Sequence, residues 1–211
     1  MNFIRKAALL FVVILTITNS YAENSHPLAY NGYSGGMMLH IGYASSNEFT
    51  LTNADGSTSE TIKASGPSMG IGGAVRIKFG NYLRVGSEGY VSTLHYGDYD
   101  SYASVGWGGV SIDCSWEINK WTMYVGSVFG GGSYKNLTHL GSTPEDYLLE
   151  NNITSYRKYG FAVVDPYFGV EYALTPRIHV TLKADYLLNV SNRQDDFISG
   201  FRLFAGFMFC R

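Results

Sequence analysis

A strict two-residue alternation of apolar and polar side chains is the feature that most constrains the fold of this chain. Between Val110 and Ile118 the even positions are apolar, and the odd positions are serine or acidic residues. After the polar pair Asn119-Lys120 the alternation resumes and runs from Trp121 to Val125. A period of two with one apolar face is typical of a β-strand, and two such runs across a two-residue break predict an antiparallel hairpin.

The same pattern recurs along the chain and predicts eight strands, at residues 35–45, 68–79, 83–96, 102–118, 121–134, 156–174, 178–190 and 197–209. Their connections alternate between two or three residues and much longer polar segments. Residues that flank a short hairpin loop face each other on one side of the sheet. The pairs expected from this rule are all apolar: Phe79 with Leu83, Ile118 with Trp121, and Leu174 with Ile178. Gly108-Gly109 predicts a bulge within the fourth strand.

The composition agrees with an all-β chain. The 211 residues include 17 Tyr and 25 Gly, and the net charge of −2 gives no reason to expect nucleic acid as a partner. Residues 1–22 have the features of a signal peptide, with Arg5-Lys6 before an apolar run and small residues before Glu23. Residues 23–34 are expected to be a periplasmic lead-in, and residues 35–211 the barrel domain. Cys114 and Cys210 are expected to be unpaired thiols.

Two eight-stranded meanders would satisfy this alternation. A soluble barrel of lipocalin type puts the apolar face inside, whereas a membrane barrel turns it outward to lipid. Short turns at one end and long loops at the other favour the membrane barrel. Aromatic residues that gather beside the short turns predict an interfacial girdle, made of Phe79, Tyr82, Trp116, Trp121, Tyr172 and Phe209.

The polar face carries nearly balanced charges, which predict a network of ion pairs inside the barrel. Opposite charges that pair with each other make burial tolerable. The expected members are Arg76, Lys78, Arg84, Glu88, Asp113, Glu117, Asp165, Glu171, Lys183, Asp185 and Arg202. Because an eight-stranded barrel is only wide enough for its own side chains, we expect this network to fill the bore.

The last strand carries the resemblance to a known family. Residues 201–209 alternate between apolar residues, including Phe201, Phe207 and the terminal aromatic Phe209, and a second face; Cys210-Arg211 follow. With the strand pattern from Gly35 onward, this resembles the small eight-stranded outer-membrane β-barrel proteins of Gram-negative bacteria (OmpX-like, OmpA-barrel and opacity-like). The resemblance implies an antiparallel up-and-down transmembrane β-barrel in the cell outer membrane. It also implies a monomer surrounded by outer-membrane lipid, assembled by the barrel-assembly machinery, with long loops at the cell surface.

The expected function is a structural or surface-interaction role without catalysis, metal or cofactor. An extracellular partner would be contacted through the loops. The tyrosines that gather there are expected to form the outer aromatic belt, with a contact surface for a partner as the alternative. Two alternatives are a narrow channel and a lipid-modifying enzyme that uses a histidine with a nucleophile and an acid. The candidate bases are His26, His40, His95, His139 and His179, of which His95 and His139 lie near acidic residues in predicted loops. A soluble lipocalin-like binding barrel is the remaining alternative.

Overall fold

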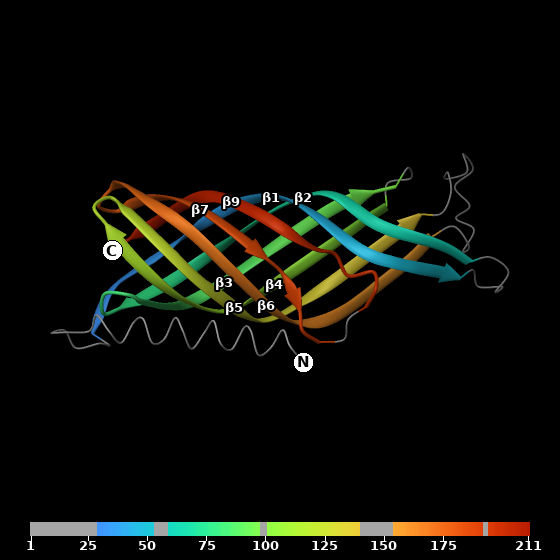
Figure 1. Cartoon of the computed structure of the whole chain (residues 1–211), viewed down its shortest axis with the longest axis horizontal. Coiled ribbons are helices and arrows are strands. Elements are labelled where there is room, and N and C mark those ends of the chain that lie inside the picture. Colours follow the sequence, from blue (N-terminus) through green and yellow to red (C-terminus); the bar gives the residue numbers. More distant parts are fainter. Residues whose placement is uncertain (1–28, 53–58, 98–100, 140–153, 192–193) are drawn as a thin grey trace.

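The computed structural model describes residues 29–52, 59–97, 101–139, 154–191 and 194–211. Within them, the chain forms antiparallel strands that wind into a single barrel (Figure 1). The strands are β1 (Tyr30–Thr52), β2 (Ser59–Phe79), β3 (Leu83–Tyr96), β4 (Ser101–Ile118), β5 (Trp121–His139), β6 (Thr154–Thr175), β7 (Ile178–Tyr186), β8 (Leu188–Asn189) and β9 (Ser199–Cys210). Among these residues no helix is long and apolar enough to cross a membrane. The predicted signal peptide lies outside the described residues.

The sheet closes on itself. From β1 to β7 each strand pairs with the next along the chain, β7 pairs with β9, and β9 pairs with β1 from Ser34↔Cys210 to Ser45↔Ser199. The short β8 follows β7 and pairs with the same strand, β6. Together, β7 and β8 therefore take the place of one strand in an eight-stranded barrel. This confirms the predicted fold. Closure leaves no open sheet edge along these pairings, as a barrel surrounded by hydrocarbon requires.

The short turns lie together at one end of the barrel, which we call the short-turn end, and the opposite end is the far end (Figure 1). Asn119 adopts a φ of 58°, the left-handed conformation that asparagine tolerates in a tight hairpin turn. Phe79 pairs with Leu83, and Ile118 pairs with Trp121, as predicted.

Two register predictions are wrong. At the third hairpin, Ile178 pairs with Thr175 rather than Leu174, because the register shifts after Ala173. The predicted bulge at Gly108-Gly109 does not occur, since both pairings of β4 run through these glycines without a shift. In the sequence, the apolar positions change from odd to even numbers at these glycines, because the large apolar side chains that precede them lie on the inner face. Trp107 and Val105 are buried inside the barrel, on the same face as Asp113.

Around the short-turn half, the outer wall is apolar. Its side chains are exposed although they are large and hydrophobic: Met37, Leu39, Ile41, Met69, Ile71, Val75, Ile77, Val91, Val110, Met123, Phe129, Phe168, Leu182, Leu203 and Phe207. We call this surface the apolar belt. A water-soluble barrel would hide these side chains inside, so the lipocalin-like alternative is wrong. The belt is the surface that a transmembrane barrel presents to lipid.

Several strands continue beyond the belt at the far end. β1 runs to Thr52 and β2 begins at Ser59, where a long polar loop was predicted, and β5 and β6 likewise extend to His139 and from Thr154. At the other end β1 begins at Tyr30, within the predicted lead-in.

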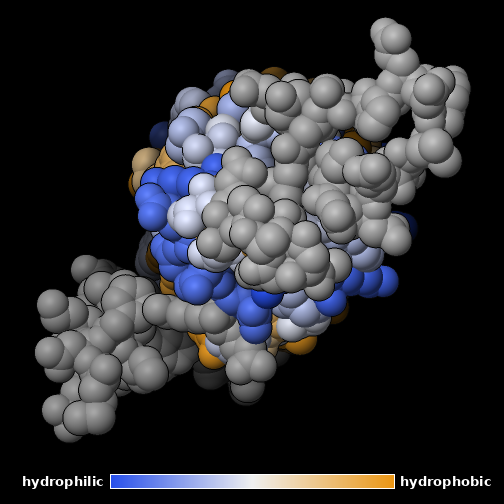
Figure 2. All heavy atoms as spheres, turned by 90° about the vertical axis from the view of Figure 1, so that its right-hand side faces the viewer, coloured by the Kyte–Doolittle hydropathy of each residue, from blue (hydrophilic) through white to orange (hydrophobic). Residues whose placement is uncertain are grey.

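The polarity of the two faces reverses in this extension, which we call the far section. Its exposed residues are polar: Asn47, Glu48, Thr50, Thr61, Lys63, His95, Lys135 and Lys158. Its buried residues are mainly apolar: Phe49, Leu51, Ala64, Leu94, Tyr96, Ala103, Val105, Tyr134, Phe161 and Val163. Polar side chains buried among them are hydrogen-bonded, as Asn136 and Thr138 are to the Tyr96 hydroxyl. In β1 a register shift between Ser45 and Glu48 accompanies the change. Where coloured atoms are visible from the far end, many of those nearest the viewer are hydrophilic, and hydrophobic ones lie on the flanks (Figure 2). The far section therefore has the faces of a sheet in water, and the reversal marks the edge of the lipid-facing wall.

The belt predicts where a charge is tolerated. Leu182 is outward-facing and 55% exposed midway along β7. Leu182→Arg should cost about 2–4 kcal/mol of folding free energy in lipid, because the guanidinium would face hydrocarbon. The matched change Thr61→Arg, on the polar outer wall of the far section, should cost less than ~1 kcal/mol. Denaturant titration of folding into vesicles, followed by heat-modifiable gel mobility, measures both. Equal costs would show that the two outer surfaces face the same medium.

Candidate functional site

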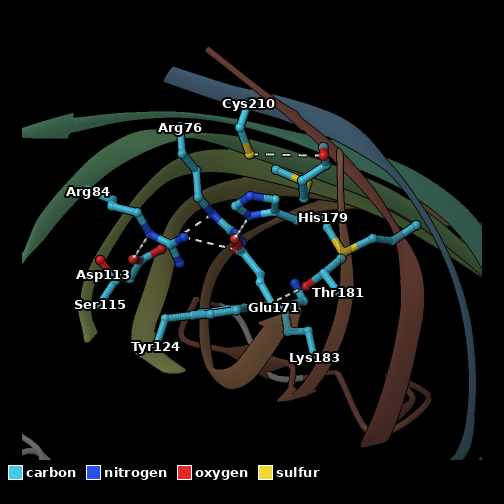
Figure 3. A network of polar contacts seen from close by, with 12 residues as sticks. Arg76, Arg84, Asp113, Ser115, Tyr124, Glu171, His179, Thr181, Lys183 and Cys210 are labelled. Atoms are coloured by element: carbon cyan, nitrogen blue, oxygen red, sulfur yellow. Dashed lines mark hydrogen bonds and ion pairs between the residues drawn. The ribbon is translucent and has the colours of Figure 1, made fainter. Parts of the chain in front are cut away.

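The short-turn half of the bore contains a buried network of charged side chains. Its members come from six strands and point inward. The cations are Arg76, Arg84, Lys183 and Arg202, and the carboxylates are Glu88, Asp113, Asp165, Glu171 and Asp185. All nine belong to the set expected from the sequence, and each is 5% exposed or less. Figure 3 shows the part of this network that surrounds Glu171.

Arg76 is the centre of the network. From β2 it contacts Glu88 on β3, Asp113 on β4 (Nε–Oδ2, 3.3 Å) and Glu171 on β6 (Nη1–Oε1, 3.2 Å). Arg84 also binds Asp113 and Glu171, at 2.6 Å from its Nε to Asp113 Oδ1 and 2.9 Å from its Nη1 to Glu171 Oε1 (Figure 3). Because β2 and β6 are not neighbours in the sheet, these contacts join walls of the barrel that no backbone ladder joins.

A second group of ion pairs continues from Glu88. Lys183 on β7 donates to Glu88 Oε2 at 2.8 Å and lies 3.7 Å from Asp185 Oδ2. Arg202 on β9 binds Asp185 Oδ1 at 2.8 Å and Asp165 Oδ1 at 3.3 Å. The network therefore runs continuously across the bore, and each cation lies between carboxylates.

Aromatic rings fill the space around these charges. The Arg76 and Arg84 guanidinium groups lie 4.8 and 4.6 Å from the centre of the Tyr124 ring, and Arg202 lies 4.2 Å from that of Trp107. Trp107 also donates from Nε1 to Asp165 Oδ2 at 3.1 Å. Cation–π contacts of this kind contribute more where water is displaced. Trp107 and Tyr124 were not predicted as members of the interior, because alternation alone does not distinguish an inward aromatic side chain from a lipid-facing one.

Some of these rings lie over inward-facing glycines. An added Cβ at Gly72 would come within 2.2 Å of the Tyr90 ring, and one at Gly169 within 2.4 Å of the Tyr124 ring. In each case the glycine and the tyrosine are direct partners on neighbouring strands. The missing side chain leaves the space that the ring occupies, so only glycine fits opposite it.

Lys78 and Glu117 were expected in the network but lie at its rim. They pair with each other near the short-turn end, where the Glu117 side chain is 59% exposed. Because both lie one or two residues from a turn, water reaches them, and the pair is a surface salt bridge.

The far section has a different interior. Its apolar core is completed by residues 194–198, which follow β8 and fold into the mouth of the barrel. The Phe197 ring packs against Tyr134 and Phe161, with centroids 5.6 and 4.9 Å apart. The prediction that a charged network fills the whole bore is therefore wrong for this half. Water outside the far section makes an apolar interior the stable arrangement there.

Asp196 fixes this segment in the mouth. Its carboxylate, which is fully buried, accepts a hydrogen bond from Tyr159 (3.1 Å) and lies 3.5 Å from Arg157 Nη1. Its backbone carbonyl accepts from the Tyr134 hydroxyl. The sequence predicts Asp196 in a loop, since a single acidic residue beside other polar ones gives no sign of burial. We call residues 194–198 the mouth segment.

The six residues of the predicted girdle all lie at the short-turn end. Trp121 and Tyr172 are direct partners on β5 and β6, with ring centroids 4.6 Å apart. Phe209 is 61% exposed in the last strand. Tyr30 and Tyr33 are exposed at the same end and extend the group. The sequence analysis had assigned them to the lead-in.

Among the described residues, the histidines considered for catalysis lie at separate places in the barrel. His40 is buried among rings, 4.7 Å from that of Phe204, and neither of its ring nitrogens has a hydrogen-bond partner among the described residues. His95 lies on the outer wall beside Tyr102. His179 lies 3.7 Å from Glu171 at the short-turn end (Figure 3). His26 and the acidic loop neighbours of His95 and His139 lie outside the described residues.

Cys114 and Cys210 are free thiols. In the part of the chain that the structure describes, no group of three or more His, Cys, Asp and Glu is placed to hold a metal ion.

Comparisons with known proteins identify the fold. No family model and no curated protein matches the chain. Among solved structures, it is similar to the Neisserial surface protein A, at 15% identity and a TM-score of 0.51, over 86% of this chain and 98% of that one. It is also similar to the attachment invasion locus protein Ail of Yersinia pestis, at 14% identity and a TM-score of 0.46, over 86% and 99% of the two chains. The outer membrane protease OmpT of Escherichia coli matches at 10% identity and a TM-score of 0.46, over 89% and 100%.

The closed sheet, the outward belt and the similarity to Neisserial surface protein A define the class. The chain has the fold of the small outer-membrane β-barrel proteins, as the resemblance in its sequence predicted.

The buried network predicts a large difference between two similar substitutions. Glu88→Gln removes a buried carboxylate that binds both Arg76 and Lys183. Asp113, Glu171 and Asp185 still contact these two cations, so the loss of one buried partner should cost at most about 3–5 kcal/mol. Glu117→Gln removes a charge from the exposed pair with Lys78 and should cost less than ~1 kcal/mol. Urea unfolding of the two variants in the same detergent measures the difference. Similar losses would mean that the interior pairs are as well solvated as the rim pair.

Proposed function

We propose that this protein is a closed outer-membrane barrel that carries a rigid surface platform for contact with partners outside the cell. The far section would lie at the cell surface and the short-turn end in the periplasm. The observation that carries the proposal is the reversal of polarity along the strands. It gives the extension a polar outer wall and an apolar core of its own.

Two groups of buried side chains, one in each half of the barrel, support a closed bore. The charged network occupies the short-turn half, where Arg76 contacts carboxylates from three strands. The mouth segment occupies the far half, where Phe197 and Ile198 are buried. Side chains of an eight-stranded barrel are sufficient to fill it. A narrow channel would need both groups to open at once.

The outer wall of the far section supports the contact role. It presents exposed polar residues together with Tyr156, which is 56% exposed. Tyrosine at a surface offers large contact area at low entropic cost. Its position on a paired strand above an apolar core means that little further ordering is needed on binding.

Catalysis receives less support from this geometry. Hydrolysis of a lipid needs a nucleophile and a base within hydrogen-bond distance, and an acid that orients the base. Among the described histidines, His179 has a carboxylate neighbour in Glu171, but that carboxylate also binds Arg76 and Arg84. Two cations at one carboxylate favour a structural role for it.

A closed bore predicts the electrical behaviour of the protein. In planar bilayers the parent should give no conductance steps, under conditions where a porin gives them. The double variant Asp196→Ala, Phe197→Ala should also be silent, because the charged network still closes the short-turn half. Regular steps from the parent would exclude a closed barrel, and steps from the double variant alone would show that the mouth segment is the only barrier.

The contact role predicts a specific loss on removal of one hairpin extension. Cells that express the parent should bind an array of glycans and matrix proteins more than cells carrying an empty vector. A variant in which residues 46–64 of the β1–β2 hairpin are replaced by a short turn should keep heat-modifiable mobility and lose part of that binding. Parent cells that bind no more than the vector control would count against a contact role.

A further inference from the structure

Two lysines lie directly opposite each other on the outer wall of the far section. Lys135 on β5 and Lys158 on β6 are register partners, and both are exposed. Side chains in this relation start only about 5 Å apart, and like charges placed so destabilise a sheet. The ion pairs that involve lysine in the described residues are those of Lys78 and Lys183. The repulsion between Lys135 and Lys158 is therefore not relieved by a carboxylate of the described chain.

The other hairpin of the far section shows the opposite arrangement. Lys63 on β2 is the register partner of Glu48 on β1, and both are exposed. The same section of the barrel thus matches a lysine with a glutamate in one hairpin and with a second lysine in the other. The paired lysines form a local positive site in a chain whose net charge is −2.

The residues around the two lysines suit an anion. Lys135 has Ser104 as its partner on β4, so the neighbouring side chain on that strand is small and uncharged. The next pair toward the belt is Ser133 with Gly160, and these small side chains leave the ammonium groups accessible from that direction. None of the register partners of either lysine is acidic.

The height of the site fits the headgroup layer of a bilayer. Strand spacing of about 3.3 Å per residue and a tilt of about 40° give a rise of roughly 2.5 Å per residue along the barrel axis. A belt about 25 Å tall that starts at Trp121 would then end near Gly131, with Lys135 about 10 Å beyond it. Lysine stems reach along a surface toward an interface. The headgroup layer extends roughly 5–8 Å beyond the hydrocarbon core on each side, so ammonium groups whose stems lean toward the belt can meet phosphates within that layer.

From the like-charged pair, its neighbours and its height, we infer that Lys135 and Lys158 bind the phosphate group of a phosphate-bearing lipid in the outer leaflet. One phosphate between the two ammonium groups removes their repulsion and satisfies both. The lipid's apolar part continues down the wall toward Phe129. This site is independent of the proposed contact with soluble partners, since it uses the lipid that surrounds the barrel.

The test compares lipid A that carries both phosphates with the same lipid after removal of the phosphates. The full chain is folded in zwitterionic detergent, bound lipid is counted by native mass spectrometry, and thermal stability is followed by heat-modifiable mobility. The parent should bind the phosphorylated lipid and gain stability from it. The double variant Lys135→Gln, Lys158→Gln should bind it about 30-fold more weakly, at about 1 kcal/mol for each lysine. Lys63→Gln, the control from the matched hairpin, should bind as the parent does.

A charge reversal separates binding from folding. Lys158→Glu places opposite charges across the ladder, so without lipid this variant should be at least as stable as the parent, and it should lose the response to phosphorylated lipid. Parent-like binding by the double variant or by Lys158→Glu would overturn the site. An equal response of the parent to dephosphorylated lipid would show that the acyl chains alone are recognised. A full response to inorganic phosphate would show a site for free anions, and would also overturn the lipid assignment.

Discussion

The ladder between β1 and β9 is the constraint on which the rest of the structure depends. Hydrocarbon offers no partner for backbone N–H and C=O groups, so a sheet that faces lipid must close. Twelve residue pairs from Ser34↔Cys210 to Ser45↔Ser199 make that closure. Closing a sheet that is eight strands wide produces a narrow bore in which inward side chains meet one another rather than water. The ion pairs of Arg76 and the rings that lie over Gly72 and Gly169 follow from this crowding.

The second constraint is the change of solvent along the strands. Where lipid surrounds the wall, apolar side chains face outward and charges must pair inside. Where water surrounds it, the preference reverses, and Phe49 and Phe161 turn into the bore while Lys63 and Lys135 turn outward. The two interiors are stabilised differently. Buried ion pairs contribute little net stability and mainly penalise the loss of a partner, whereas the apolar core of the far section gains from burial itself. We expect the far section to carry much of the stability of the barrel outside the lipid.

The sequence predicts the lipid-facing part of this fold, where the two-residue alternation of apolar and polar side chains holds throughout. β3 begins and ends where the alternation predicts, and nine of the expected charges meet in the bore, because lipid outside and polar groups inside give a clear period of two. The prediction fails where this alternation changes. The strands beyond the belt seemed to be loops because their polar residues face outward and a register shift after Ser45 breaks the parity. Asp196 and Trp107 were missed for a related reason: their burial depends on partners from distant strands, Tyr159 and Asp165, which local pattern does not reveal.

These constraints also limit where function can reside. A side chain that holds two or three partners across the bore, as Glu88 and Arg76 do, cannot be moved or exposed without leaving charges unpaired. Substrate passage or catalysis inside the short-turn half would have to leave these buried charges unpaired at each turnover. The outer wall of the far section carries no such requirement, because its polar side chains are solvated and its backbone is already ordered. Of the charges there, Lys63 faces Glu48, whereas Lys135 and Lys158 face each other. An uncompensated charge on an ordered surface is a place where binding can lower the free energy of the protein, so binding is favoured on the outer surface rather than in the bore.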